Sequence, residues 1–433
     1  MRFSGLLEEF SDQLRGAERV WVAFSGGLDS TLLLHACVEF LGAEKLGALH
    51  LDHQLQEDSD QWLEHCQKET EKLGVELRYR KLNVINQGEG IESEARRQRY
   101  QFFSENIASG ELLLLGHHGD DQAETFLYRL FRGSGARGLS GMPQERKLAN
   151  SNILRPLLAF PKKHLEELAK SAHLTWIEDP SNSDDRFDRN YIRNQVIPVI
   201  QDRWPSMQSR ILRAANNLTA ASKLLDEYAH ILAQQCGLRS ERLGQSIDIQ
   251  NFSSFSEETK DLLLNFLLRQ QNLLGYDSSC LAKVEALLLS GEDKEPILSL
   301  SGAEIRRYAG RLFIMRALLP NSFANYNCDW NGKEAIKISG CGHLKFDKAY
   351  SGSQLIVGFR QGGERCKPLE RNKSQSLKKL FQEYNLEPWL RDRTPLLWQG
   401  DQLVAVAGLF SCAEAIPIPS ISWQVISENK QEN

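Results

Sequence analysis

SGGLDS, residues 25–30, follows the apolar run VWVAF of residues 20–24 and precedes a stretch with helical periodicity, residues 30–41. This order predicts a strand, a tight turn and a helix. Because Gly26 and Gly27 have no Cβ atom, the backbone there can turn sharply and approach a ligand closely. The amide groups of such a turn and the N-terminus of the helix together form a concave site for an anion.

The other side chains of the hexapeptide suit a nucleotide. Ser25 and Ser30 can donate hydroxyl hydrogen bonds to phosphate oxygens, and Asp29 can hold Mg²⁺ beside them. The hexapeptide is not a Walker loop, because no Gly-Lys-Ser/Thr follows it. The alternative is a strand–helix turn without a ligand, which two glycines alone would fit equally well.

Strands and helices alternate along the first 131 residues, as in a parallel sheet with helices on both faces. Ligands of such sheets bind at the carboxyl ends of the strands, which is where the motifs of this chain lie. The further strands that we expect are residues 46–51, 75–82 and 112–115, and the further helices are residues 58–74, 92–108 and 120–131.

A second motif, GHHGDDQAET at residues 116–125, follows an expected strand and opens a helix. Glu124 lies three and four positions after Asp121 and Asp120, so the three carboxylates can share one helix face. Three carboxylates this close repel one another unless a cation lies among them. A metal ion or an ammonium group would fit.

The hexapeptide resembles the pyrophosphate-binding loop of the ATP pyrophosphatases, and the later motifs resemble one family among them, the tRNA(Ile)-lysidine synthetases. The chain departs from the family pattern at Gln56, where the family usually has an arginine after HLDHQL. The motifs that carry the resemblance are Glu92, Ala95, Arg96, Arg99 and Tyr100 on one helix, RGSGARGLSGM (132–142), RPLL (155–158), EDPSN (178–182), RNYIR (189–193), RQGGER (360–365), LKKLFQE (377–383) and PWLR (388–391).

The resemblance implies an ATP-dependent ligase that joins free L-lysine to carbon 2 of the wobble cytidine of tRNA(Ile) with a CAU anticodon. ATP would be split into AMP and pyrophosphate, an adenylated cytidine would be the intermediate, and codon reading would change from AUG to AUA. ATP and Mg²⁺ are the implied cofactors. The alternative is a tRNA thiolase of the same superfamily, which the absence of any CxxC pair disfavours.

The resemblance also suggests which residues act. Asp29 and Asp121 would hold Mg²⁺, and the carboxylates of the second motif would recognise the lysine ammonium or a metal, with His117 or His118 near the proton transfer. In the structural alternative, Asp120 caps its helix and the histidines only pack. The candidate catalytic residues are Asp29, His117, His118, Asp121 and Glu124; the ATP-binding residues are Ser25, Gly26, Gly27, Leu28, Asp29 and Ser30; and the contacts to lysine or adenylate are Arg96, Asp120, Glu124 and Arg132.

Basic residues gather in three segments of a chain whose formal net charge is −5. Residues 129–155 have a net charge of +5, and residues 186–213 and 360–393 each have +4. Such segments fit an RNA whose phosphates contact several domains, and solvated faces are the common alternative. The candidate tRNA-binding residues are Arg189, Arg193, Arg360, Arg365, Lys378, Lys379 and Arg391.

The length of 433 residues predicts two or three domains. We expect an α/β fold in which a parallel-sheet PP-loop ATP-binding domain covers residues 1–216. A mainly helical middle domain over residues 217–318 and a small β-rich, tRNA-binding domain over residues 335–433 would follow. Residues 217–290 have helical periodicity without strands, and the polar residues 319–331 are expected to form a linker.

The composition excludes several other classes. At 41% hydrophobic and 25% charged residues, the chain is typical of globular proteins. No apolar run approaches the ~20 residues of a membrane helix, and the N-terminus lacks the features of a secretory signal. The eight cysteines are scattered. These features predict a cytoplasmic protein without a membrane partner. They do not decide whether the protein forms a homodimer.

Overall fold

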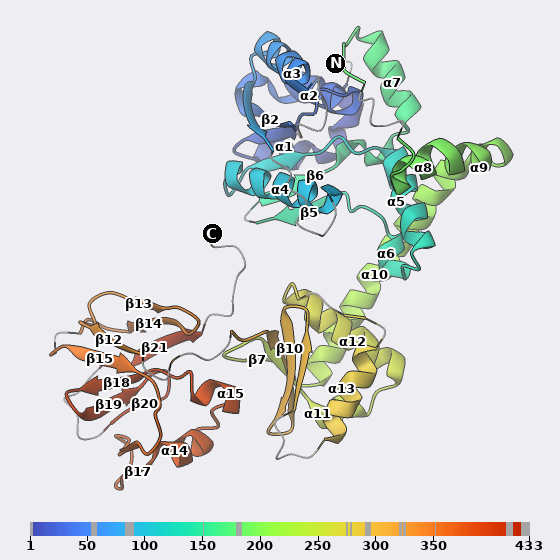
Figure 1. The fold of residues 1–433 in the computed structure, drawn as a ribbon. Helices are drawn as coiled ribbons and strands as arrows, with labels where there is room; N and C mark the ends of the chain where they lie inside the picture. The colour runs from blue at the N-terminus through green and yellow to red at the C-terminus, as the bar shows by residue number, and fades with distance from the viewer. Residues whose placement is uncertain are drawn as a thin grey trace. The chain divides into compact units, whose positions relative to one another are not determined.

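The computed structural model describes residues 3–52, 59–82, 91–149, 151–178, 184–273, 276–277, 279–290, 296–319, 323, 326–350, 352–412 and 419–425. The chain forms two compact units, Met1–Leu224 and Leu225–Asn433 (Figure 1). The boundary between them falls within the long helix α10 (Met207–Gln235).

The first unit is built on a six-stranded sheet in the order β3-β2-β1-β4-β6-β5. Val20 of β1 lies opposite Leu46 of β2 on one side and Leu112 of β4 on the other, and every pair is parallel except the hairpin β5–β6 at one edge. The expected parallel sheet is therefore confirmed. The strands are β1 (Val20–Ala23), β2 (Leu46–Asp52), β3 (Glu76–Lys81), β4 (Leu112–Leu114), β5 (Glu145–Leu148) and β6 (Ser151–Leu154).

Helices surround this sheet. The longer ones are α1 (Ser11–Gly16), α2 (Leu28–Leu41), α3 (Ser59–Leu73), α4 (Ile91–Asn106), α5 (Gly119–Phe131), α7 (Lys162–Ser171) and α9 (Ile197–Arg203). The short ones are α6 (Ala136–Leu139), α8 (Asp188–Tyr191), the π-helical turn η6 (Ile192–Val196) and the 3₁₀ turns η1 (Ser4–Leu6), η2 (Glu8–Phe10), η3 (Ala43–Lys45) and η4 (Pro156–Ala159).

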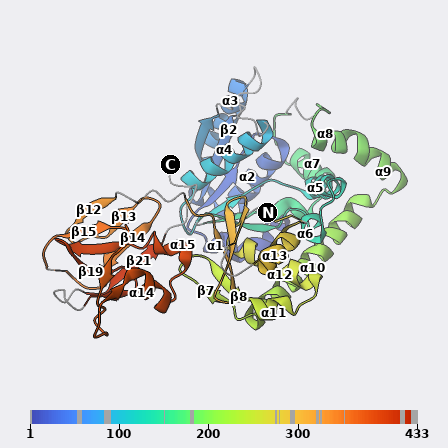
Figure 2. The same ribbon diagram turned by 60° about the horizontal axis from the view of Figure 1, so that its bottom comes forward.

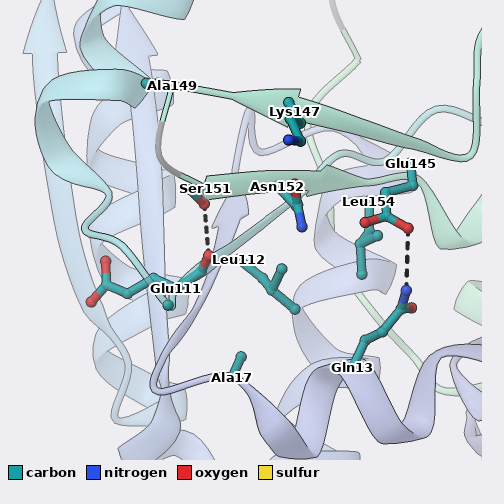
Figure 3. Close-up of a pocket in the computed structure, with 11 residues that line it drawn as sticks. Gln13, Ala17, Glu111, Leu112, Glu145, Lys147, Ala149, Ser151, Asn152 and Leu154 are labelled. Atoms are coloured by element: carbon teal, nitrogen blue, oxygen red, sulfur yellow. Dashed lines mark hydrogen bonds between the residues drawn. The ribbon is translucent and has the colours of Figure 1, made fainter.

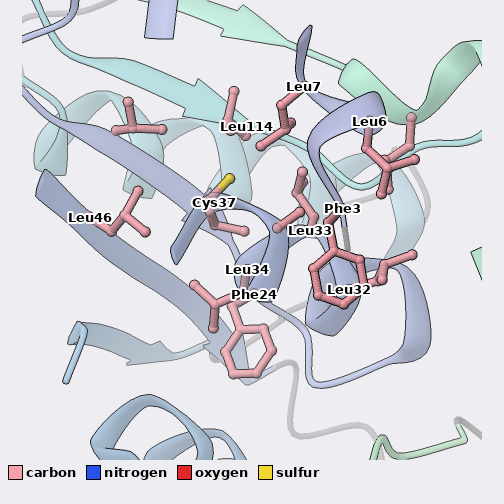
Figure 4. Packing of buried hydrophobic residues seen from close by; sticks show 14 of the residues in the cluster. Phe3, Leu6, Leu7, Phe24, Leu32, Leu33, Leu34, Cys37, Leu46 and Leu114 are labelled. Carbon is pink, nitrogen blue, oxygen red and sulfur yellow. The ribbon is translucent and has the colours of Figure 1, made fainter. Parts of the chain in front are cut away.

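Apolar side chains cover both faces of the central strands, because a parallel sheet with helices on both sides has no solvated face. On one face, Leu32 and Leu34 of α2 pack in a core with Leu46 and Leu114 (Figure 4). On the other face, a second core joins aromatic residues of α4 to Trp21 of β1. The sheet is thereby held rigidly, and the loops at its edges can be positioned with it.

The chain order reverses between β1 and β4, which are neighbours in the sheet. Ligands of open α/β sheets bind outside the carboxyl ends of the strands at such a reversal. The hexapeptide at residues 25–30 follows β1, and the motif at residues 116–125 follows β4. The topology therefore brings the two motifs to one edge of the sheet.

The second unit begins with helices packed on an antiparallel sheet in the order β7-β8-β11-β10-β9. Ala309 and Gly310, both with positive φ, form the turn between β10 and β11. The expectation that residues 217–290 contain no strand is wrong, because β7 and β8 lie there. Both are short and polar; β8 pairs with a distant strand, β11, and β7 pairs with β8. The elements are β7 (Arg239–Ser240), β8 (Gln245–Asp248), α11 (Ile249–Ser253), α12 (Glu257–Gln270), α13 (Cys280–Leu289), β9 (Ile297–Leu300), β10 (Ala303–Tyr308) and β11 (Arg311–Arg316).

The C-terminal part of this unit is rich in antiparallel strands (Figure 2). The expected linker is wrong for Asn327–Trp330, which form β12. Cys328 and Trp330 are less exposed than Asn327 and Asp329, a strand alternation that polar composition conceals. The elements are β12 (Asn327–Trp330), β13 (Ile336–Ile338), β14 (Gly342–Phe346), β15 (Leu355–Gly358), β16 (Arg365–Cys366), β17 (Gln375–Ser376), α14 (Leu377–Glu383), α15 (Pro388–Arg391), β18 (Leu396–Gln399), β19 (Gln402–Val406), β20 (Phe410–Ser411) and β21 (Ile421–Val425). Among the described residues, no helix combines the length and apolarity needed to cross a membrane.

Candidate active site

The turn after β1 is closed by its own serine side chains. Ser30 Oγ accepts a hydrogen bond from Ser25 N at 3.1 Å and donates one to the Gly27 carbonyl at 3.1 Å. The two serine hydroxyls lie 3.0 Å apart, and Ser25 Oγ accepts from Gly27 N at 3.3 Å. The closed turn lies at the N-terminus of α2, where backbone amides and the helix dipole favour an anion.

Neighbouring elements hold this turn in place. Gly26 has a φ of +81°, and a Cβ atom there would lie 3.0 Å from Cys66 Sγ of α3, so glycine is required. Ile177 N donates a hydrogen bond to the Gly26 carbonyl at 2.9 Å. His50 of β2 is buried and its Nδ1 lies 2.8 Å from the Phe24 carbonyl; burial lowers the pKa of this imidazole, so it is neutral and donates its Nδ1 proton there.

His118 begins α5 and links the second motif to the first. Its Nδ1 accepts from Asp121 N at 3.4 Å, and its own amide donates to Asp121 Oδ2 at 3.0 Å, a reciprocal cap of the helix. Because Nδ1 accepts, a neutral His118 carries its proton on Nε2. This Nε2 lies 3.6 Å from Asp29 Oδ2 and 3.5 Å from Asp121 Oδ2. The structure thus brings together Asp29, His118 and Asp121.

One carboxyl oxygen of Asp29 lacks a hydrogen-bond partner. Burial raises its pKa, and the charge of Asp121 adds to that effect, whereas His118 and Lys162 oppose it. Its Oδ1 is buried and has no hydrogen-bond partner. A buried oxygen of this kind costs free energy until a donor or a cation reaches it. Mg²⁺ commonly binds one or two carboxylates together with substrate phosphates, so Asp29 fits this ion.

Arg193 of η6 pairs with two carboxylates of α5. Its Nε lies 2.5 Å from Glu124 Oε1, and its Nη2 lies 2.9 Å from Glu124 Oε2 and 3.2 Å from Asp121 Oδ1. Burial raises the pKa of Glu124, and Arg193 opposes this rise. Burial would lower the pKa of Arg193, but hydrogen bonding and the charges of Glu124, Asp121 and Asp29 outweigh it, so the pKa is raised.

The expected carboxylate group is therefore present in part. Asp121 and Glu124 share a cation, the guanidinium of Arg193, although the sequence assigned Arg193 to tRNA binding. Both oxygens of Asp121 already accept from a donor, so Asp121 offers less to Mg²⁺ than Asp29 does. Asp120 lies apart from the pair: its Oδ1 accepts from Lys162 N at 3.2 Å and so caps α7 rather than its own helix.

His117 follows β4 in an environment that disfavours its charged form. Burial lowers its pKa to about 4, against the charge of Asp121, and the positive charges of Arg155, Arg99 and Arg189 lower it further. Its Nδ1 is buried and has no hydrogen-bond partner. At neutral pH His117 is therefore an uncharged imidazole with an unused polar atom.

We expect His117 to make the stability of the fold depend on pH. Its pKa is near 6.5 in an unfolded chain and about 4 in the folded one. The unfolded state therefore binds more protons between these values, so the free energy of unfolding should fall by about 2 kcal/mol from pH 7 to pH 5 on account of this group. Urea unfolding at both pH values tests this: His117→Gln should lose less stability than the wild type. Equal losses would contradict the assignment.

Two of the candidate arginines lie on tyrosine rings instead of on the carboxylates. The guanidinium carbon of Arg96 is 5.1 Å from the centre of the Tyr100 ring. That of Arg132 is 5.3 Å from the centre of the Tyr128 ring, and its Nη1 donates to the Tyr128 hydroxyl at 2.5 Å. The structure does not group these arginines with Asp121 and Glu124.

The remaining candidate RNA contacts differ in exposure. Arg360 is half-buried and pairs with Asp392 at 3.3 Å. Arg391 is also half-buried, and its Nε donates to the Leu386 carbonyl at 3.2 Å while its Nη2 lies 3.5 Å from the Tyr308 hydroxyl. The exposed candidates are Arg189, Arg365, Lys378 and Lys379.

A pocket of about 560 Å³ lies elsewhere in the first unit, between α1 and strands β5 and β6 (Figure 3). Gln13 Nε2 donates to Glu145 Oε2 at 3.2 Å, and Ser151 Oγ donates to the Glu111 carbonyl at 2.6 Å. None of its lining residues belongs to either motif, so this pocket is separate from the candidate site.

Sequence reasoning missed the residues that support the turn. His50 opens the HLDHQL stretch that resembles the family pattern, but neither it nor Cys66 nor Ile177 was assigned a role, and all three reach the turn only through the fold. Ile177 directly precedes the EDPSN motif, and this adjacency is the one signal that could have located it. Residues 179–182 of that motif, like Gln56, lie outside the described residues.

Three family models match the chain. A PP-loop domain matches residues 2–200, and this match indicates ATP binding. A TilS substrate binding domain matches residues 247–313, and a TilS substrate C-terminal domain matches residues 355–423.

Curated relatives match nearly the whole chain. A tRNA(Ile)-lysidine synthase of Coxiella burnetii is 35% identical over 422 residues, which cover 94% of this chain and 92% of the relative. One of Pseudomonas putida is 37% identical over 403 residues, or 91% of this chain and 93% of the relative. Among solved structures, the U34-tRNA thiolase NcsA of Methanococcus maripaludis has a TM-score of 0.40 at 16% identity, over 50% of this chain and 80% of its own. The identity and coverage of the curated relatives establish that this chain is an enzyme of the tRNA(Ile)-lysidine synthase family.

Proposed function

We propose that this enzyme ligates free L-lysine, through its side-chain amine, to carbon 2 of the wobble cytidine of tRNA(Ile) with a CAU anticodon. ATP is split into AMP and pyrophosphate, and an adenylated cytidine is the intermediate. The product, lysidine, changes codon reading from AUG to AUA. The observation that carries the proposal is the meeting of Asp29, His118 and Asp121 at neighbouring strand ends, in a chain of this family.

The first half-reaction must improve a poor leaving group, the oxygen on carbon 2. Attack of this oxygen on the α-phosphorus of ATP forms the adenylate and breaks the bond to the β-phosphate, so pyrophosphate leaves. The amides of residues 25–30 and the N-terminus of α2 suit that polyanion. When bound at Asp29, Mg²⁺ would neutralise charge that develops on the pyrophosphate.

The second half-reaction needs an uncharged amine. At pH 7 a lysine side chain with a pKa near 10.4 is neutral in about one molecule in 2,500, equivalent to roughly 4.6 kcal/mol. A site that binds the ammonium and then removes its proton lowers this cost. Asp121 and Glu124 already stabilise one cation, Arg193, which supports them as the groups that receive the ammonium.

His117 is better suited than His118 to accept the proton. His118 uses its Nδ1 as a helix cap, whereas the Nδ1 of His117 is buried without a partner. A pKa of about 4 places His117 about 6 units below a lysine ammonium, so direct transfer would cost about 9 kcal/mol. Transfer after the new carbon–nitrogen bond begins to form avoids this cost, because the attached nitrogen is then acidic. Departure of AMP completes the reaction.

Mass spectrometry tests the proposal directly. Isoleucine tRNA with a CAU anticodon is incubated with the protein, ATP and lysine, and its nucleosides are then analysed. We expect lysidine at the wobble position, formed only when both ATP and lysine are present, with one pyrophosphate released for each lysidine. Absence of lysidine from a protein that binds ATP and tRNA would contradict the proposal. Exchange of oxygen for sulfur would instead support the thiolase alternative, which the burial of all cysteines except Cys328 disfavours.

A further inference from the structure

Three arginine side chains from different elements gather around one tyrosine of the first unit. The guanidinium carbons of Arg96 on α4 and Arg146 on β5 lie 5.1 and 5.3 Å from the centre of the Tyr100 ring. Arg155 directly follows β6 and is only 3% exposed. Burial lowers its pKa, Tyr100 opposes this effect, and the charges of Arg146 and Arg96 add to it, so the three arginines act on one another.

In the described part of the chain, this group of arginines has no counter-charge. Among the residues that the structure describes, no carboxylate forms an ion pair with Arg96, Arg146 or Arg155. Two nearby acids have other partners. Glu94 pairs with Arg97 at 2.6 Å, and Glu145 accepts a hydrogen bond from Gln13. Like charges this close repel one another, so the arrangement favours an anion among them.

Arg155 has a donor that is still unused. Its Nη1 donates to the Pro143 carbonyl at 2.8 Å, but its Nε is buried and has no hydrogen-bond partner. A buried donor without an acceptor costs roughly 1–3 kcal/mol. An anion that accepts from this guanidinium would remove that cost. Arg155 is therefore the fixed, buried member of the group, and Arg96 and Arg146 are its exposed members.

The group lies on the side of the candidate site away from the nucleotide turn. Arg155 follows β6, which neighbours β4, and its charge acts on His117 after β4. β6 is the second neighbour of β1, so about 10 Å separates their ends at the usual strand spacing of about 4.8 Å. An anion among these arginines is thus distinct from the phosphates that residues 25–30 would hold.

We propose that Arg96, Arg146 and Arg155 form a phosphate-binding site that holds a backbone phosphate of the RNA substrate close to the reacting cytidine. The identity of that RNA rests on the proposed function. The site gives Arg96 a ligand other than the lysine or adenylate that the sequence suggested. Tyr100 holds the exposed arginines over its ring, which reduces the entropy they lose when they bind phosphate. A phosphate of the nucleotide is the other source of the same chemistry.

The test compares RNA and nucleotide binding in surface variants. Arg146→Gln, Arg96→Gln and the double variant remove exposed charges, and Arg97→Gln, on the same helix but paired with Glu94, is the matched control. Dissociation constants are measured for isoleucine tRNA over a series of KCl concentrations and for ATP at one. We expect the double variant to bind tRNA about 10-fold more weakly, with the salt slope reduced by about 1–2, and to bind ATP within about twofold of the wild type.

Each other outcome overturns the site. Weaker ATP binding with unchanged tRNA binding would assign the arginines to the nucleotide. Unchanged binding of both would make them solvated side chains, and the same conclusion would follow if the Arg97→Gln control lost as much tRNA affinity as the double variant. A wild-type protein without salt-dependent affinity for the tRNA would exclude the site as well. The proposed function is tested separately. A wild-type protein that binds tRNA but forms no lysidine would contradict the proposed function without contradicting the phosphate site.

Discussion

Replacement of Asp29 by alanine is expected to lower kcat/KM for lysidine formation by on the order of 1,000-fold. The carboxyl of Asp29 is the group in the candidate site with a buried oxygen that nothing in the described structure satisfies, next to the turn that would hold the pyrophosphate. Without it, the site would lose the residue that would hold Mg²⁺, the ion that would neutralise the charge developing when the α–β bond of ATP breaks. The lysine site that we propose at Asp121 and Glu124 should be unaffected.

Single-turnover assays separate these effects. Labelled ATP and isoleucine tRNA, without lysine, report adenylate formation, and adding lysine to preformed adenylate reports the second half-reaction. Asp29→Asn, which keeps the shape but not the charge, should be nearly as slow as Asp29→Ala in the first assay. Asp202→Ala, on the exposed part of α9, is the matched control. Adenylate formation at the wild-type rate in Asp29→Ala would remove the basis of the mechanism.

Burial gives Asp29 a direction of pH dependence as well. Because its pKa is raised, the carboxyl accepts a proton at a higher pH than an ordinary aspartate does. Protonation removes the charge that a cation needs, so adenylate formation should fall as pH is lowered through this raised pKa. His118, whose Nε2 faces the same carboxyl at 3.6 Å, would lose this partner at the same time.

The centre of the first sheet could be predicted from the sequence because β1, β2 and β4 are nearly continuous apolar runs, whereas the polar hairpin β5–β6 was not predicted. The strand expected at residues 20–24 is observed as Val20–Ala23, and the helix expected at residues 120–131 as Gly119–Phe131. A parallel strand buried on both faces needs apolar residues at nearly every position, and such short apolar runs after turn residues predicted β1, β2 and β4. Topology then placed both motifs at one edge without any knowledge of side-chain positions.

The parts that could not be predicted depend on residues far apart in the chain. Arg193 is 69 positions after Glu124, and only the fold of η6 against α5 brings the two together. The same reason applies to Trp389 of α15, whose ring centre lies 5.0 Å from that of Phe313 on β11. Local sequence patterns predict secondary structure, whereas contacts between residues far apart in the chain depend on tertiary packing.

Glu124→Gln is expected to raise the KM for lysine by about 100-fold, with little change in adenylate formation. The Glu124 side chain is only 5% exposed and forms two hydrogen bonds to Arg193, so its negative charge is held in a place that stabilises cations. An amide of the same shape removes the charge, and charged hydrogen bonds of this kind are worth about 1.5–3 kcal/mol each. Glu167→Gln, an exposed glutamate of α7, is the matched control.

A double-mutant cycle with Arg193→Gln shows whether the pair acts as a unit. Removing Arg193 leaves a buried carboxylate without its main cation, which raises the pKa of Glu124 further and favours its neutral form. We therefore expect Arg193→Gln alone to raise the KM for lysine as well, and the double variant to be no worse than Glu124→Gln. A coupling of about 2–3 kcal/mol would follow. Additive losses, or a wild-type KM for lysine in Glu124→Gln, would mean that the ammonium binds elsewhere.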